Sequence, residues 1–239
     1  MTMLKNDPLL QALFWSVMTI AFYAFGKELH HRRPCFWTSP LVVAPLLLIL
    51  AALSLHVTYG QYISGTHWLV GMLAPATVAF AIPIYEERVL ISYHWPLLIM
   101  GVLVGSVISM LSSWGLADLL GLSRSLRLSL LPRSVTTPFA MIISGDIGGV
   151  PQLTAVFVLI TGVLGVTIGE VLLSVLPLQS ALARGVLLGM GAHAVGTAKG
   201  HQIDKEVGAI AGLVMVLVGL LNVLAAPLLG HLLAAIQKQ

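Results

Sequence analysis

The sequence predicts an all-α polytopic membrane protein with about seven or eight membrane segments, two of them broken or re-entrant. Hydrophobic residues make up 58% of the chain and charged residues only 9%, and the mean hydropathy is +0.98. A soluble domain carries about 25% charged residues, so this chain lacks the polar surface to cover itself in water. A membrane helix needs about 20 mostly apolar residues, and the chain consists largely of apolar runs of about that length.

These apolar runs follow one another with only short polar stretches between them, which predicts a single membrane domain over residues 1–239. The runs cover about residues 8–25, 40–56, 67–85, 95–121, 128–144, 151–177, 182–198 and 207–236. We expect early scaffold helices in 8–60, two possible repeat units in 66–121 and 126–177, each with a broken segment, and C-terminal helices in 182–236.

The first run resembles the apolar core of a signal peptide, but we interpret it as a retained membrane span. No small-residue cleavage pattern follows it, and it leads directly into the basic residues 27–33. This is the densest basic loop of the chain, so the positive-inside rule places it in the cytoplasm and the N-terminus outside.

Proline interrupts two of the apolar runs. Pro75 and Pro83 divide the run 67–85, and Pro132 and Pro138 divide the run 128–144. Proline removes a backbone donor and clashes with the preceding turn, so both segments should be kinked, broken or re-entrant. Pro75 and Pro132 match when the chain is shifted by 57 residues, which suggests an internal repeat.

Pairs of glycines four residues apart recur in the apolar runs. These pairs are at positions 101/105, 165/169, 185/189 and 208/212. Glycine at this spacing lets helix backbones approach closely in lipid. We interpret the pairs as intramolecular packing sites rather than as a dedicated dimer seam.

The strongest candidate for a binding residue is Arg133, which lies in the proline-bracketed segment 131–138 beside Ser134, Thr136 and Thr137. An arginine in an apolar setting costs about 2.5–3.5 kcal/mol on insertion scales, so it should have a partner or face water. Together with backbone N–H groups at a helix break, these side chains predict a cradle for a carboxylate. The alternative is an interfacial arginine that reaches the headgroups, with hydroxyls that only cap the break.

A second group of candidates follows the same segment. Asp146, with Gly148 and Gly149, should form a tight loop, and its carboxylate could pair with Arg133, bind a cation or carry a coupling proton. A local turn or helix cap explains the same residues equally well.

His193, Gly196 and Thr197 form a third group, inside an otherwise apolar helix. A histidine in a membrane span is a candidate proton carrier, and Gly196 and Thr197 offer a second place for the helix to unwind. A buried histidine bonded to a neighbouring carbonyl is the plain alternative.

Glu86, at the exit of the run 67–85, is a weaker coupling candidate, because glutamates at helix ends are usually solvated.

Several classes of function have no support in the sequence. The sequence lacks the HExxH, GxxxxGK[ST] and GxSxG motifs, which argues against the enzyme classes that carry their catalytic residues in these motifs. The eight histidines do not cluster at metal-ligand spacing, and no basic stripe with interleaved aromatics indicates nucleic-acid binding. We therefore expect that the protein is not an enzyme and that it binds no cofactor and no metal ion.

Four motifs follow one another along the chain: LAPATVAFAIPIYE (73–86), LPRSVTTPFAM (131–141), SGDIGGVPQLTAV (144–156) and ARGVLLGMGAHAVGTA (183–198). In these motifs and in their order the chain resembles the LrgB/CidB family of antiholin-like bacterial membrane proteins. Family members commonly carry lysine where this chain has Arg133, so the charge is kept but its geometry differs.

The resemblance implies a multi-pass protein of the bacterial inner membrane and one of two functions. The first is transport of small monocarboxylates of the pyruvate or glycolate type, as in the similar plastid-envelope translocator of glycolate and glycerate, and we expect alternating access with coupling to protons. The second is non-transporting regulation of murein hydrolase release and cell lysis with a holin-like (LrgA/CidA-type) subunit. A third reading makes the chain one half of a two-component transporter. The expected partners are a small organic anion, membrane lipid and a second copy of the chain.

Overall fold

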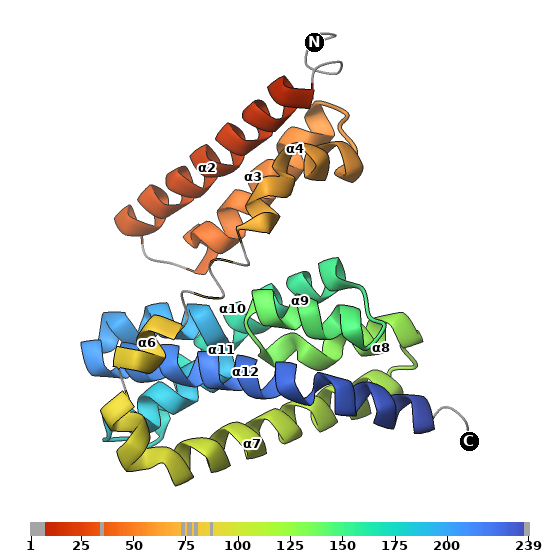
Figure 1. The fold of residues 1–239 in the computed structure, drawn as a ribbon. Helices are drawn as coiled ribbons and strands as arrows, with labels where there is room; N and C mark the ends of the chain where they lie inside the picture. The colour runs from red at the N-terminus through yellow and green to blue at the C-terminus, as the bar shows by residue number, and fades with distance from the viewer. Residues whose placement is uncertain are drawn as a thin grey trace. The chain divides into compact units, whose positions relative to one another are not determined.

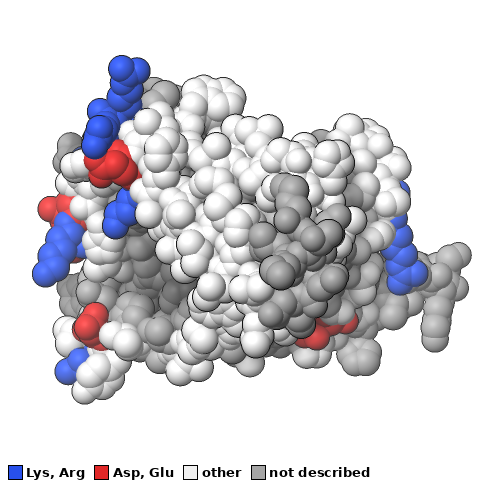
Figure 2. Space-filling view, turned by 90° about the horizontal axis from the view of Figure 1, so that it is seen from above, with Lys and Arg blue, Asp and Glu red and all other residues white. Residues whose placement is uncertain are grey.

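The computed structural model describes residues 8–33, 36–72, 75, 78, 81–86 and 88–236. Every regular element in these ranges is a helix, which confirms the all-α prediction. Four helices are long and apolar enough to cross a membrane: Leu9–Arg32, Arg88–Leu119, Pro151–Val175 and Lys205–Gly230. Figure 2 shows broad areas of the visible surface without any charged side chain, as expected for a surface in contact with lipid. The seven or eight segments remain a prediction.

The chain folds into two compact units, residues 1–76 and 77–239. The first unit contains α2 (Pro8–Arg32), the 3₁₀ turn η1 (Phe36–Thr38), α3 (Pro40–Ser54) and α4 (Tyr59–Gly71). Helix α2 packs against both α3 and α4 (Figure 1). Trp68 Nε1 donates to Ser16 Oγ at 2.7 Å, and the Trp15 ring meets Tyr62 edge-on at 5.4 Å between centroids.

The basic residues 27–33 differ from the expected loop. Helix α2 continues through them to Arg32, and the Arg32 Nε donates to the Glu28 carboxylate at 2.8 Å, one turn earlier. Cations are favourable at a helix C-terminus because they face the negative end of its dipole. The basic cluster therefore ends a helix instead of forming a separate loop.

The second unit carries the remaining helices. They are α6 (Ala81–Glu86), α7 (Arg88–Leu119), α8 (Arg124–Leu130), the 3₁₀ turn η2 (Leu131–Ser134), α9 (Thr137–Asp146), α10 (Pro151–Val175), α11 (Ala181–Ile203) and α12 (Lys205–Ile236). Helix α12 packs against α11, α9 and α7, and 61% of its apolar window is buried. Its side chains Leu213 and Val214 belong to the same buried core as Ile143 of α9. Helix α12 is thus the central helix of this unit.

The helical path is interrupted between α8 and α9. The 3₁₀ turn η2 contains Pro132, and the next two residues, Val135 and Thr136, are extended, with ψ values of 148° and 145°. Pro138 then lies in the first turn of α9, where its missing N–H costs no hydrogen bond. Most of residues 73–80 lie outside the described part of the chain, so the break at Pro75 and the internal repeat remain predictions.

Helix α11 has a sharp interruption at His193, where φ is +43° and ψ is −122°. Gly196 lies against the backbone of Leu188, eight residues earlier, which it could not reach along a straight helix. A non-glycine residue in this backbone region costs about 1–3 kcal/mol, and such strain is concentrated at functional sites. The two halves of α11 therefore fold against each other at His193.

Glycines in α10 and α11 allow their neighbours to approach closely. A Cβ on Gly169 of α10 would lie 3.2 Å from Leu188 Cδ2 of α11, and a Cβ on Gly185 of α11 would lie 2.6 Å from Ile210 Cβ of α12. Both contacts are within one chain, as the intramolecular interpretation of the glycine pairs requires.

A buried polar network joins α8, α9 and α10. The Thr154 hydroxyl of α10 donates to the Ser129 carbonyl of α8 at 2.9 Å and hydrogen-bonds to Ser144 Oγ of α9 at 2.7 Å. All three side chains are fully buried. The connection between α9 and α10 turns at Gly148, whose φ of +85° favours glycine.

Replacing Thr154 by valine should lower the free energy of unfolding by about 1–3 kcal/mol, because buried polar groups of Ser129 and Ser144 lose their partner. Thr167→Val, in the same helix, is the matched control. Among the residues described, its hydroxyl bonds only to the Val163 carbonyl of its own helix, and we expect a change within about 0.5 kcal/mol. Thermal unfolding of both variants in lipid nanodiscs measures the difference, and equal midpoints would contradict the network.

Candidate functional site

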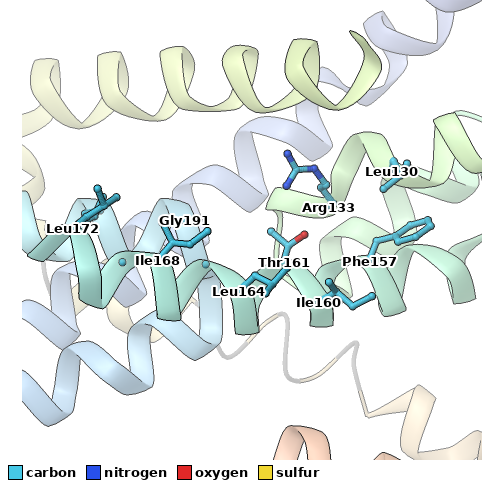
Figure 3. A pocket seen from close by; sticks show the side chains of 12 residues that line it. Leu130, Arg133, Phe157, Ile160, Thr161, Leu164, Ile168, Leu172 and Gly191 are labelled. Atoms are coloured by element: carbon cyan, nitrogen blue, oxygen red, sulfur yellow. The ribbon is translucent and has the colours of Figure 1, made fainter. Parts of the chain in front are cut away.

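A pocket of about 480 Å³ in the second unit is bordered by the end of α8, η2, α10 and α11. Arg133 is the only charged residue of its lining and Thr161 the only hydroxyl-bearing one; the other lining residues are apolar side chains and glycines. Figure 3 shows the α10 part of the lining along that helix, with Arg133 of η2 near Thr161 and with Ile168 and Leu172 farther along.

Arg133 is held at this pocket by a single side-chain hydrogen bond. Its Nε donates to Ser113 Oγ of α7 at 2.7 Å, and Ser113 Oγ in turn donates to the Ser109 carbonyl at 2.7 Å. Ser113 is 4% exposed. Among the described residues no further hydrogen bond uses the guanidinium. The bond to Ser113 therefore orients the group and leaves its two terminal nitrogens free to bind a ligand.

The charge of Arg133 has no counter-ion in the described part of the chain. The ion pairs there are Arg32–Glu28, Arg127–Asp118 and Lys199–Glu170. Arg127 and Lys199 resemble structural cations because each is paired with a carboxylate. Arg133 differs from them, since an unpaired guanidinium in an apolar setting is costly and is typical of a ligand or ion pathway.

The position of Arg133 follows from its neighbours in the sequence. Leu131 and Val135, on either side, are 5% and 0% exposed and belong to the hydrophobic core of the unit. They anchor the 3₁₀ turn, which contacts α7, α9 and α10. The Arg133 side chain is therefore the part of this turn that reaches the pocket.

The three hydroxyls predicted to complete the cradle do not line the pocket. Ser134 and Thr136 are buried, at 7% and 5% exposure, and Thr137 is half-buried. In residues 88–236 none of these hydroxyls makes a hydrogen bond, and Thr136 does not cap α9. Their role in binding remains a prediction.

His193 lies directly behind the pocket rather than in its lining. Its ring packs against the Arg133 backbone, and its Nδ1 faces Gly162 of α10, 3.4 Å from where a Cβ would lie there. The side chain is 3% exposed, and its Nε2 has no hydrogen-bond partner among the described residues. His193 therefore lies against the backbone of the residue that supplies the pocket's charge, and its role as a proton carrier remains a prediction.

Gly196 and Thr197 support the break in α11 and do not line the pocket. Gly196 packs on the Leu188 backbone. The Thr197 hydroxyl donates to the His193 carbonyl at 2.9 Å, and its methyl group lies near Gly212 of α12. The unwinding expected at Gly196 and Thr197 occurs instead at His193.

The suggested coupling residues lie outside the pocket lining. Asp146, at the end of α9, is exposed, and the suggested pair with Arg133 does not form within the described residues. Gly148 makes the turn after α9, and a Cβ on Gly149 would lie 3.0 Å from the Ser129 amide nitrogen. Glu86 is exposed at the end of α6. The local-turn explanation fits Gly148 and Gly149 best.

The sequence reasoning missed the α10 wall of the pocket, above all Thr161, Phe157 and Gly165. The weak signal was a hydroxyl one residue before a glycine in an apolar helix, which is more often plain helix packing. No group of three or more histidines, cysteines, aspartates and glutamates that could bind a metal occurs in the described ranges.

Comparison with known proteins gives relatives along nearly the whole chain. The model of the LrgB-like family matches residues 19–232. The uncharacterized protein YwbG of Bacillus subtilis is 41% identical over 212 residues, which cover 89% of this chain and 94% of YwbG. The holin-like protein CidB of Staphylococcus aureus is 30% identical over 219 residues, which cover 92% of this chain and 96% of CidB. No solved structure matches. The chain therefore belongs to the LrgB-like family.

Proposed function

We propose that this protein is a transporter, not an enzyme, that carries small monocarboxylates across the bacterial inner membrane. The observation that supports this most strongly is Arg133, a cation without a carboxylate partner among the described residues, oriented by Ser113 at the edge of an apolar pocket. A guanidinium binds a carboxylate through two parallel hydrogen bonds, and the terminal nitrogens of Arg133 are free to make them.

The substrate class follows from the chemistry of the lining. One cation and one hydroxyl, Arg133 and Thr161, suit a ligand with one carboxylate and one adjacent oxygen, such as a 2-oxo or 2-hydroxy acid. The strained break at His193 lies behind this site and is the natural hinge for alternating access. His193 or Asp146 would carry a coupling proton, and the transporter would act as a dimer.

The second candidate is a non-transporting regulator of cell lysis that acts with a holin-like membrane subunit. The name of the Staphylococcus aureus relative, holin-like protein CidB, favours this reading. A regulator has no need of an unpaired arginine at a pocket, which is why we place transport first. A two-component transporter, in which the holin-like subunit is required for uptake, would combine the transport function with the holin-like partner.

Uptake of radiolabelled pyruvate and glycolate into proteoliposomes tests the proposal, with an imposed inward proton gradient. The native chain should accumulate label, Arg133→Gln should reduce uptake to the background of empty liposomes, and Arg133→Lys should retain part of it because the charge is kept. All three proteins are first compared for insertion and thermal unfolding.

The outcomes separate the three readings. Uptake by the chain alone supports a one-component transporter, and uptake only after a holin-like subunit is added supports the two-component form. No uptake in either case favours the regulator. Uptake that Arg133→Gln leaves unchanged would move the binding site away from η2.

A further inference from the structure

The pocket at Arg133 is much longer than a carboxylate site requires. Its lining continues along α10 from Thr161 to Leu172, which at the rise of an α-helix is about 16 Å. Ile160, Leu164 and Ile168 repeat at the spacing of one helical face and remain about half exposed, at 49%, 52% and 58%. No charged or hydroxyl-bearing residue lines the pocket beyond Thr161.

The α10 wall of the pocket suits an apolar part of a ligand and does not suit a second polar group. A volume of about 480 Å³ lies within the range of about 300–1,000 Å³ typical of sites for drug-sized ligands. A three-carbon acid held at Arg133 would leave most of that space unfilled. An apolar tail that extends from the carboxylate would instead cover the stripe that runs toward Leu172.

The opposite wall has room for such a tail because of Gly191 in α11. Gly191 lines the pocket, and a Cβ built on it meets no atom within 4 Å. Gly165 and Gly169, also in the lining, face α11 instead, since a Cβ on them would meet Gly191 or Leu188. Gly191 therefore keeps the apolar part of the pocket open.

We infer that the preferred substrate is a 2-oxo or 2-hydroxy monocarboxylate with an apolar side chain of four or more carbons, its carboxylate at Arg133 and its tail along α10. This inference rests on the proposed function and narrows its substrate class. Burying one methylene group contributes about fourfold in affinity. Within a homologous series, affinity should rise by about that factor per carbon until the tail reaches the end of the pocket at Leu172.

Binding of a 2-oxo acid series from three to ten carbons, measured by calorimetry with protein in nanodiscs, tests the inference. Empty nanodiscs correct for partition of the longer acids into lipid. Gly191→Leu fills the apolar part of the pocket, and Gly115→Leu is the matched control. Gly115 is exposed on α7 outside the pocket lining, and a Cβ there also meets nothing within 4 Å.

We expect tighter binding with each added carbon in the native protein and in Gly115→Leu. Gly191→Leu should flatten this series, so that the longest acids bind no more tightly than pyruvate does to the same variant. Binding that requires Arg133 but does not change with chain length, or that Gly191→Leu does not alter, would overturn the inference and leave the proposed function intact. If no acid binds, or if Arg133→Gln binds the whole series like native, both fail.

Discussion

Replacing Gly165 by alanine should destabilise the second unit strongly, with a loss of about 3 kcal/mol or more in the free energy of unfolding. A Cβ at this position of α10 would collide with the Gly191 carbonyl oxygen and lie 2.9 Å from the Gly191 carbonyl carbon and 3.3 Å from Ala192 Cα. These atoms are backbone, so no side-chain rotation relieves the clash. Helices α10 and α11 would have to separate, and the pocket between them would lose its shape.

The matched control is Gly191→Ala, the same change on the other side of this helix contact. A Cβ on Gly191 meets no atom within 4 Å, and alanine favours a helix by about 1 kcal/mol over glycine. Gly191→Ala should therefore unfold at the native temperature or slightly above it. Thermal unfolding of the purified proteins in nanodiscs measures both changes.

Gly165→Leu extends the comparison, because its side chain cannot fit against Gly191 in any rotamer and should prevent recovery of folded protein. If Gly165→Ala is as stable as Gly191→Ala, the close approach of α10 and α11 is wrong. The pocket geometry derived from that approach would then be wrong as well.

Much of the fold could be predicted because the causes are local in the sequence. Pro132 and Pro138 disfavour one continuous helix, so a break at 131–136 could be expected from the residues alone. The break in α11 was expected at Gly196 and Thr197, where glycine permits unwinding. It lies instead at His193, whose positive φ is imposed by the packing of the two half-helices and leaves no mark in the sequence.

Of the residues that line the pocket, only Arg133 was predicted from the sequence. Arg133 is conspicuous because a cation in an apolar run is costly, and this cost is visible without a structure. The hydroxyls of Ser134, Thr136 and Thr137 follow it in sequence, but the extended residues after η2 direct them away from the pocket lining. Thr161 and Gly191 belong to the pocket because α10 and α11 pack closely, a tertiary contact that one sequence does not reveal.

Replacing Arg133 by methionine should raise the stability of the protein and abolish the proposed uptake of monocarboxylates. The native charge is half-buried, has one hydrogen bond to Ser113 and no carboxylate within the described residues. Removing it saves a cost of up to about 2.5–3.5 kcal/mol on insertion scales. Methionine fills similar space without a charge, and Ser113 keeps its bond to the Ser109 carbonyl. We expect a higher unfolding temperature and uptake at the level of empty liposomes.

Arg127→Met is the control that separates a binding charge from a structural one. Arg127 pairs with Asp118 and donates to the Leu122 carbonyl at 2.7 Å, so its loss should lower the unfolding temperature. The proposed uptake by the folded variant should be retained. If Arg133→Met raises the unfolding temperature and Arg127→Met lowers it, Arg133 is a residue kept for function at the expense of stability. A drop in stability for Arg133→Met like that of Arg127→Met would make Arg133 structural. Full uptake by Arg133→Met would mean that the anion is held elsewhere in the membrane domain.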